Sequence, residues 1–135
     1  MNMKKAVVYY SGTGNTQAMA EKIAAVSGAE LITFDEFVPA KTTEYDVLAL
    51  GCPAMGAEVL EEEIVQPAFD EMKPLLKGKR VALFGSYGWG DGEWMRSWED
   101  DCRAAGAELI CDSVICQETP DDDALQACEN LAKAM

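Results

Sequence analysis

The sequence contains no histidine, which removes the side chain most often used as a general base near neutral pH and the catalytic triads built on it. It has five cysteines, an odd number, and none of them forms a Cys-x-x-Cys pair. Neither a disulfide framework nor a thiolate metal cluster fits this pattern. We therefore expect reduced thiols, as in a cytoplasmic protein, and no metal site.

Basic residues are scarce: 11 Lys and Arg stand against 24 Asp and Glu, which gives a formal net charge of −13. Phosphate backbones and anionic membrane surfaces would be repelled, so neither nucleic acid nor a membrane is an expected partner. Long apolar runs and a secretory leader pattern are also missing. The acidic surface either attracts basic protein partners or serves solubility alone.

Apolar, β-branched stretches alternate with amphipathic ones along the 135 residues. The expected strands are Lys4–Tyr10, Glu30–Phe34, Asp46–Cys52, Arg80–Ser86 and a last one within Glu108–Ile115. Four helices are expected: one from after Thr16 up to Gly28, two that span Glu61–Met72 and Glu93–Ala105, and a last one that begins near Thr119. This order predicts a single α/β domain over residues 1–135, with a five-stranded parallel sheet covered by helices on both faces. Only the stretch Phe37–Tyr45 is irregular.

In such a sheet, ligands bind beyond the carboxyl ends of the strands. The loop after the first strand reads Ser11-Gly12-Thr13-Gly14-Asn15-Thr16, with neutral side-chain donors and two glycines at a helix N-terminus. These features predict a cradle for a phosphate group. The loop has no P-loop lysine, and Gln17 stands where a dinucleotide fingerprint has its third glycine. The alternative is an ordinary polar turn, since such residues are common in turns.

Two further loops end at the same edge. After the third strand come Pro53-Ala54-Met55-Gly56-Ala57-Glu58, and after the fourth come Ser86-Tyr87-Gly88-Trp89-Gly90. A flat conjugated ring could be sandwiched between Met55 and Trp89. Trp94 and Trp98, four residues apart in the next helix, are instead expected in the core, and Cys52 is expected to be an inert buried thiol.

The motifs S-G-T-G-N-T, G-C-P-A-M-G-x-E and G-S-Y-G-W-G-x-G-E-W occur in this order, and essentially the whole chain resembles the short-chain flavodoxins of anaerobic bacteria. The resemblance implies a flavodoxin-like three-layer sandwich with strand order 2-1-3-4-5, flavodoxin itself being the standard example of that order. It also implies a low-potential one-electron carrier with non-covalently bound FMN, which shuttles electrons between redox proteins and is not an enzyme. No residue would then be catalytic, because the flavin performs the redox chemistry.

By the same resemblance, residues 11–16 would hold the FMN phosphate with Ser86 near it, and Met55 and Trp89 would flank the isoalloxazine ring. Glu58 would face the N3 and N5 edge of the ring, and backbone groups from Gly88 to Gly90 would meet its pyrimidine end. The expected FMN-binding residues are Ser11, Gly12, Thr13, Gly14, Asn15, Thr16, Pro53, Ala54, Met55, Gly56, Ala57, Glu58, Ser86, Tyr87, Gly88, Trp89 and Gly90.

Acidic residues in or beside these loops would ring the exposed flavin edge and attract basic redox partners. They are Glu58, Glu61, Glu62, Glu63, Asp91 and Glu93. We expect a monomer, since no spare segment would build the second substrate pocket of a dimeric FMN-dependent reductase. That reductase and a non-catalytic interaction module remain alternatives. A phosphoacceptor receiver domain is rejected, because the sites of its acidic residues hold Tyr10-Ser11 and Cys52-Pro53.

Overall fold

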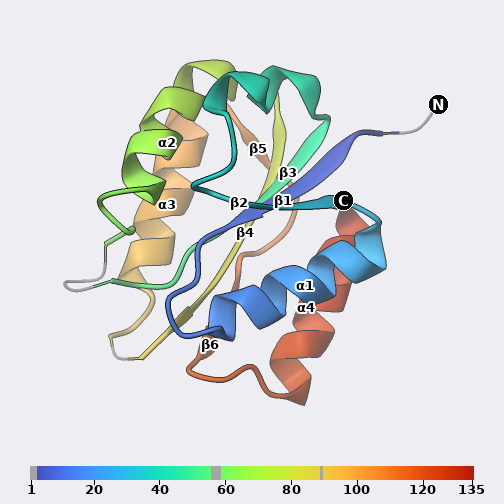
Figure 1. The fold of residues 1–135 in the computed structure, drawn as a ribbon, viewed down its shortest axis with the longest axis vertical. Coiled ribbons are helices and arrows are strands. Elements are labelled where there is room, and N and C mark those ends of the chain that lie inside the picture. Colours follow the sequence, from blue (N-terminus) through green and yellow to red (C-terminus); the bar gives the residue numbers. More distant parts are fainter. Residues whose placement is uncertain (1–2, 56–58, 89) are drawn as a thin grey trace.

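The computed structural model describes residues 3–55, 59–88 and 90–135 (Figure 1). The strands are β1 (Lys5–Tyr9), β2 (Glu30–Thr33), β3 (Val47–Gly51), β4 (Arg80–Tyr87), β5 (Glu108–Leu109) and β6 (Val114–Gln117). The helices are α1 (Asn15–Ser27), α2 (Val65–Met72), α3 (Glu93–Ala104) and α4 (Asp122–Ala134), with short 3₁₀ turns η1 (Pro39–Glu44) and η2 (Lys73–Leu75). Strands and helices alternate as the sequence predicts.

All strand pairs in the sheet are parallel, and the order is β2-β1-β3-β4-β5, with β6 also paired to β4. The predicted order 2-1-3-4-5 is therefore confirmed. Between β1 and β3 the chain changes its direction of travel across the sheet. The loops that follow β1, β3 and β4 thus leave from one edge around this switch point, where open α/β sheets bind their ligands.

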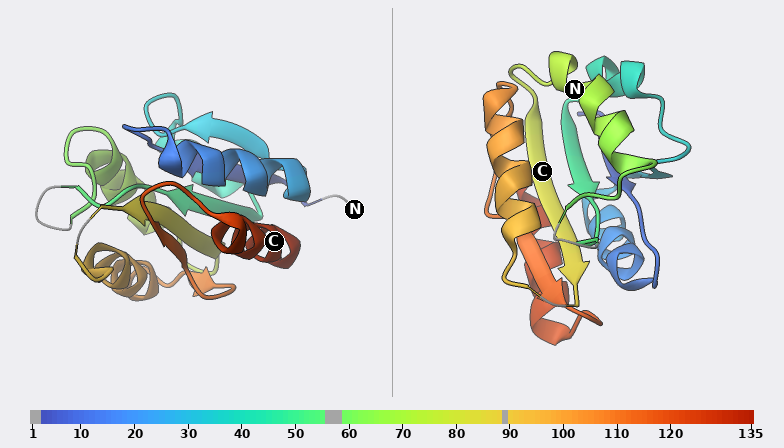
Figure 2. Two further views of the ribbon diagram at one scale, coloured as in Figure 1. Left: turned by 90° about the horizontal axis from the view of Figure 1, so that it is seen from below. Right: turned by 90° about the vertical axis from the view of Figure 1, so that its left-hand side faces the viewer.

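Successive residues of the central strands face opposite sides of the sheet, as the period of two requires. In β3, Leu48 and Leu50 enter the core beneath α2 and α3, whereas Val47 and Ala49 enter the core beneath α1 and α4. Figure 2 shows the resulting three layers, with the sheet between the two helix pairs. Trp94 and Trp98 are each 1% exposed in the first core, which confirms their expected structural role.

The predicted fifth strand forms as two segments, because its register with β4 shifts along the way. Val81 pairs with Leu109 and Phe84 pairs with Val114. Between these two pairs β4 advances three residues (81 to 84), whereas the β5–β6 segment advances five (109 to 114). Two extra residues bulge out between β5 and β6. The bulge is held from outside by Ser113, whose hydroxyl donates to the Glu99 carboxylate at 2.7 Å.

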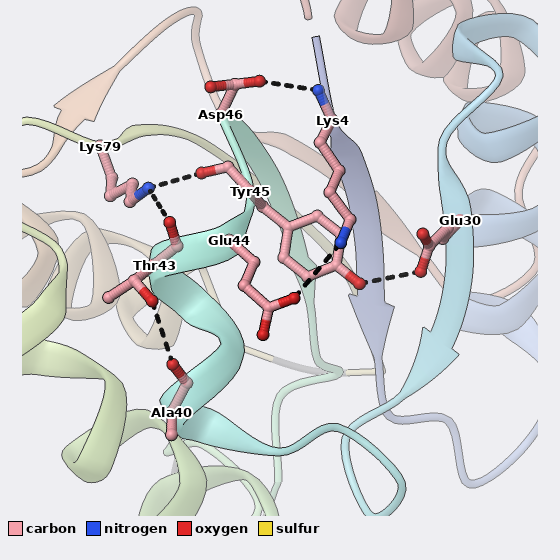
Figure 3. A network of polar contacts seen from close by, with 8 residues as sticks. All are labelled: Lys4, Glu30, Ala40, Thr43, Glu44, Tyr45, Asp46 and Lys79. Atoms are coloured by element: carbon pink, nitrogen blue, oxygen red, sulfur yellow. Dashed lines mark hydrogen bonds and ion pairs between the residues drawn. The ribbon is translucent and has the colours of Figure 1, made fainter.

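The irregular stretch 37–45 forms η1 in place of a regular helix, and Figure 3 shows how its end is fixed. The Tyr45 hydroxyl donates to Glu30 at 2.8 Å, and the Lys79 ammonium donates to the Tyr45 carbonyl at 2.6 Å. The Lys4 ammonium lies 4.8 Å from the centre of the Tyr45 ring. Burial and then the bond to Glu30 raise the pKa of Tyr45 to about 12, so the phenol stays neutral. This network lies at the amino-terminal edge of the sheet, opposite the predicted ligand edge.

Helix α2 begins at Val65, four residues later than the predicted start at Glu61. The Glu61 side chain explains the difference, because its carboxylate accepts the backbone N–H groups of Glu63, Ile64 and Val65 at 2.7, 2.7 and 3.0 Å. Burial alone would raise the pKa of this carboxyl, but the three donors together lower it below its ordinary value. Glu61 is only 7% exposed and thus belongs to the fold rather than to the predicted docking surface.

Within residues 3–55, 59–88 and 90–135, no group of three or more potential metal ligands is found. Among the helices of these same ranges, none combines the length and apolar character needed to cross a membrane.

Candidate functional site

The loop between β1 and α1 is built to present backbone N–H groups. Gly14 has φ of 96°, a left-handed conformation that a residue with a Cβ adopts at a cost, and its N–H donates to the Ser11 hydroxyl at 3.0 Å. Helix α1 then starts at Asn15 with no side-chain cap on its first turn and no acidic residue there. Its first N–H groups and partial positive charge are therefore available to an anion.

A buried hydroxyl pair joins this loop to the end of β4. The side-chain oxygens of Thr16 and Ser86 lie 2.9 Å apart, and the Ser86 N–H donates to the Thr16 oxygen at 3.3 Å. Thr16 is 1% exposed and Ser86 4% exposed. The pair fixes the position of the Ser86 backbone relative to the first turn of α1.

The loop after β3 is tied to the same end of β4. The Cys52 N–H donates to the Phe84 carbonyl at 3.2 Å, and the Ala54 N–H donates to the Ser86 carbonyl at 3.0 Å. The close approach depends on Gly85, because a Cβ there would lie 2.2 Å from the Cys52 carbonyl oxygen. That oxygen also accepts the Trp94 indole N–H at 3.1 Å. Further along, Met55 and Val59 pair through two backbone hydrogen bonds of 3.0 and 3.1 Å.

A cavity of about 430 Å³ lies between the three loops, a volume within the range of roughly 300–1,000 Å³ typical of small-molecule sites. Nine of the ten residues that line it are among those predicted from the sequence. They are Gly12, Thr13, Asn15, Pro53, Ala54, Met55, Ser86, Tyr87 and Gly88. A hollow of similar size, about 460 Å³, lies between β6 and α4 and is lined by none of the predicted residues.

The remaining predicted residues fall into two groups. Ser11, Gly14 and Thr16 act within the described structure by shaping the first loop and joining it to β4. Gly90 has a left-handed backbone, with φ of 90°, two residues beyond the end of the cavity lining at Gly88. Gly56, Ala57, Glu58 and Trp89 lie outside the described residues.

Glu118 is the tenth residue of the lining, and sequence reasoning missed it. The chain was expected to leave the sheet by Ile115, but β6 extends to Gln117, so that residues 117 and 118 reach the ligand edge. The signal available was the rule that every parallel strand ends at the same edge. If the fifth strand had been predicted to end at Gln117, this rule would have included the loop at Glu118.

The lining carries little charge. None of its described residues is Lys or Arg, and Glu118 is its one charged residue. An anion bound here would be held by neutral hydroxyls and backbone N–H groups. Cys52, beside the cavity, is fully buried, and burial raises the pKa of its thiol to about 12. It therefore stays protonated and is no nucleophile.

Comparison with known proteins agrees with this geometry. Residues 7–131 match the sequence profile of the family described as flavodoxin. The chain is 46% identical to the flavodoxin of Megasphaera elsdenii over 133 residues, which cover 95% of both chains, and 45% identical to that of Clostridium beijerinckii over 94% and 95%. The solution structure of two-electron reduced Megasphaera elsdenii flavodoxin superposes with a TM-score of 0.88 at 44% identity, covering 96% of each chain.

Proposed function

Because this chain belongs to the flavodoxin family and is thus a low-potential one-electron carrier with non-covalently bound FMN, we propose that FMN occupies the cavity between residues 12–15, 53–55 and 86–88. Bound FMN supplies the redox chemistry, since its isoalloxazine ring takes up and releases electrons. The observation that carries the proposal is that three loops predicted separately from the sequence line one cavity.

The residues present fit FMN. A phosphate dianion needs several donors, and the uncapped start of α1 together with the Thr13 and Ser86 hydroxyls supplies them. The position where Gly12 would carry a Cβ has no other atom within 4 Å, so the loop leaves open space at the cavity wall. In the proposed arrangement, residues 11–16 and Ser86 hold the phosphate, and Met55 and Trp89 flank the ring. Gly56, Ala57, Glu58 and the 88–90 backbone meet the ring edge.

The protein tunes the bound flavin through charge. The net charge is −13, and the cradle holds the phosphate without a neutralising cation from any described lining residue. These negative charges oppose the arrival of further electrons on the ring. The absence of basic residues from the described lining is thus the feature that favours a low potential.

Flavodoxins work with partner redox proteins, and we infer that the partners of this chain are basic. Support comes from the exposed acidic residues Glu62, Glu63 and Glu93 beside the site, together with Asp91, which also pairs with Arg96 at 3.0 Å. We also infer one domain over residues 1–135, since both cores share one sheet, and we propose that the chain is a monomer. The cysteines described are all free, which supports a cytoplasmic location.

The cavity assignment is tested by replacing a predicted phosphate donor. Diluting the holoprotein and recording the fluorescence of released FMN gives the dissociation constant. Thr13→Ala should raise it about 10-fold, as expected for the loss of one hydrogen bond to a charged group. Thr43→Ala removes another exposed threonine hydroxyl, at the opposite edge of the sheet, and should leave the constant within twofold. Equal effects of the two variants would refute the assignment.

The partner assignment is tested by the salt dependence of electron transfer to a small basic cytochrome. The rate should fall steeply with ionic strength, and the double variant Glu62→Gln, Glu63→Gln should lower both the rate and the slope. Glu71→Gln with Glu108→Gln removes two exposed acids from elements that end or begin at the opposite edge, and should change neither. A flat salt dependence would show that the acidic surface serves solubility instead.

A further inference from the structure

The segment that follows β6 is the part of the cavity that none of the three predicted loops includes. This inference rests on the proposed FMN site. We infer that Glu118 forms a fourth wall of the cavity, and that Gln117 and Glu118 together brace the Tyr87–Gly88 backbone in its binding-ready position.

The brace begins with the register of the sheet. Strand β6 pairs with β4 up to its last residue, so that Gln117 lies beside Tyr87. Two donors continue the pairing past the end of the strands. The Glu118 N–H donates to the Tyr87 carbonyl at 2.8 Å, and the Gln117 side-chain amide donates to the Gly88 carbonyl at 3.3 Å. The last two carbonyl groups before Trp89 are thereby held from the β6 side.

The end of β4 is held from its other side by the loop after β3, because the Ala54 N–H donates to the Ser86 carbonyl at 3.0 Å. The Tyr87 ring packs against Trp94, with the ring centres 5.5 Å apart. Residues 86–88 therefore lie in a clamp with Ala54 on one side and residues 117–118 on the other. Both sides of the clamp line the cavity, since Ala54 and Glu118 belong to its lining.

Glu118 adopts an unfavourable backbone conformation in order to make this contact. Its φ is 60°, and it is the one non-glycine residue with positive φ among those described. A residue with a Cβ persists in this region only where its surroundings fix it, and such positions cluster at functional sites. The turn at Glu118 sends the chain away from the sheet directly after its N–H has reached Tyr87, and α4 begins soon after at Asp122.

Preorganisation is what the brace contributes. A cavity wall that already has its bound shape loses less conformational entropy when the ligand arrives, and the ligand is held more tightly. The contribution comes from the Gln117 amide and from the left-handed turn at residue 118. The turn itself does not require the Glu118 carboxylate, because glycine adopts the same left-handed conformation readily.

The test compares variants of the holoprotein by FMN release on dilution and by the visible circular dichroism of the bound flavin, which reports how the ring is held. Gln117→Ala should raise the FMN dissociation constant about 3- to 10-fold, the scale of one hydrogen bond, and alter the dichroism. Gln126→Ala is the matched control. Its exposed amide also makes one side-chain hydrogen bond, to Asn130 at 3.2 Å on α4, and both readouts should stay at the wild-type values.

The turn is tested separately at position 118. Glu118→Val, whose β-branched side chain disfavours positive φ, should weaken FMN binding at least as much as Gln117→Ala. Glu118→Gly, which removes the side chain but adopts the turn readily, should weaken FMN binding less than Glu118→Val does. If Glu118→Val fails to fold, Gln117→Ala decides the question alone.

Wild-type affinity and dichroism in Gln117→Ala would overturn the brace while leaving the FMN site intact. Weakening in Glu118→Gly equal to that in Glu118→Val would also overturn it, since the side chain rather than the turn would then matter. Failure of the wild-type protein to bind FMN at all would refute the proposed site itself.

Discussion

The hydroxyl oxygens of Thr16 and Ser86 lie 2.9 Å apart although 70 residues separate them in the sequence. Thr16 stands in the first turn of α1, and Ser86 stands near the end of β4. The pair therefore joins the proposed phosphate loop to the strand that carries the proposed ring-binding loop. This contact between two buried side chains is one of the links that hold the loops of the site together, beside the bond from the Ala54 N–H to the Ser86 carbonyl.

Thr16→Val tests this relationship, because valine keeps the shape and removes the hydroxyl. We expect the free energy of unfolding to fall by about 1–3 kcal/mol, as for a buried polar partner left unsatisfied. The FMN dissociation constant should rise about 10-fold, since the Ser86 hydroxyl and N–H lose their partner. Chemical denaturation and FMN release on dilution measure the two effects.

Thr42→Val is the matched control for that variant. Thr42 is also fully buried, and its hydroxyl donates to the Pro39 carbonyl at 2.7 Å in η1, at the opposite edge of the sheet. It should lose similar stability without a change in FMN affinity. If both variants weaken FMN binding equally, the hydroxyl pair has no particular role in the site.

Alanine substitutions at two glycines should affect FMN binding and the stability of the fold separately. A methyl group at Gly12 would meet no atom within 4 Å, so Gly12→Ala should fold normally, but the methyl would enter the cradle and weaken FMN binding. A methyl group at Gly85 would lie 2.2 Å from the Cys52 carbonyl oxygen, so Gly85→Ala should destabilise the fold by at least about 2 kcal/mol. Thermal unfolding and FMN titration on both variants check this. Equal stability of the two would show that the β3–β4 contact readily relaxes.

Glu61 should make the stability depend on acidity. The pKa of its carboxyl is lower in the folded chain, where three backbone N–H groups bind the charged form, than in the unfolded chain. Its contribution is therefore fully present above the unfolded pKa of about 4.3 and is lost as the pH falls through the lower folded value. Glu61→Gln should lose about 1–3 kcal/mol of stability at pH 7, and this loss should become small only once the pH is below the folded pKa.

Glu62→Gln controls for charge alone, since Glu62 is exposed on the same segment. Denaturant unfolding at several pH values should show a smaller loss for this variant at pH 7. A loss in Glu61→Gln that is the same at pH 7 and at a pH below the folded pKa would contradict the role of the charged carboxylate.

Hydrophobic patterning predicted the fold class well, because continuous apolar runs such as Val47–Gly51 are typical of strands buried in a parallel sheet. The strand order came from the resemblance to flavodoxins and not from this patterning. Patterning failed to predict element boundaries that depend on a single side chain or on a shift in strand register. The start of α2 depends on the Glu61 carboxylate, and the break in the fifth strand depends on two extra residues between Leu109 and Val114. Neither feature leaves a mark in hydrophobic periodicity.

The site likewise contains residues that local sequence features predict and one residue that they do not. Nine residues of the cavity were predicted, from glycines and polar side chains in short loops whose chemistry is local and from the resemblance to flavodoxins. Glu118 escaped notice, since its place depends on the true end of β6 and on a positive φ that a glutamate rarely adopts. Tertiary pairing with Tyr87 imposes that conformation, and no local pattern predicts it.

The central claim is that a neutral cradle at the start of α1 binds the cofactor by its phosphate group. Calorimetric titration of the flavin-free protein with FMN and with riboflavin, which has the same ring but no phosphate, tests it most directly. Charge-assisted hydrogen bonds to the phosphate should make FMN bind at least about 100-fold more tightly than riboflavin. FAD should bind poorly, because the three loop motifs of the sequence include none for an adenosine half. Equal affinities for FMN and riboflavin would contradict the claim.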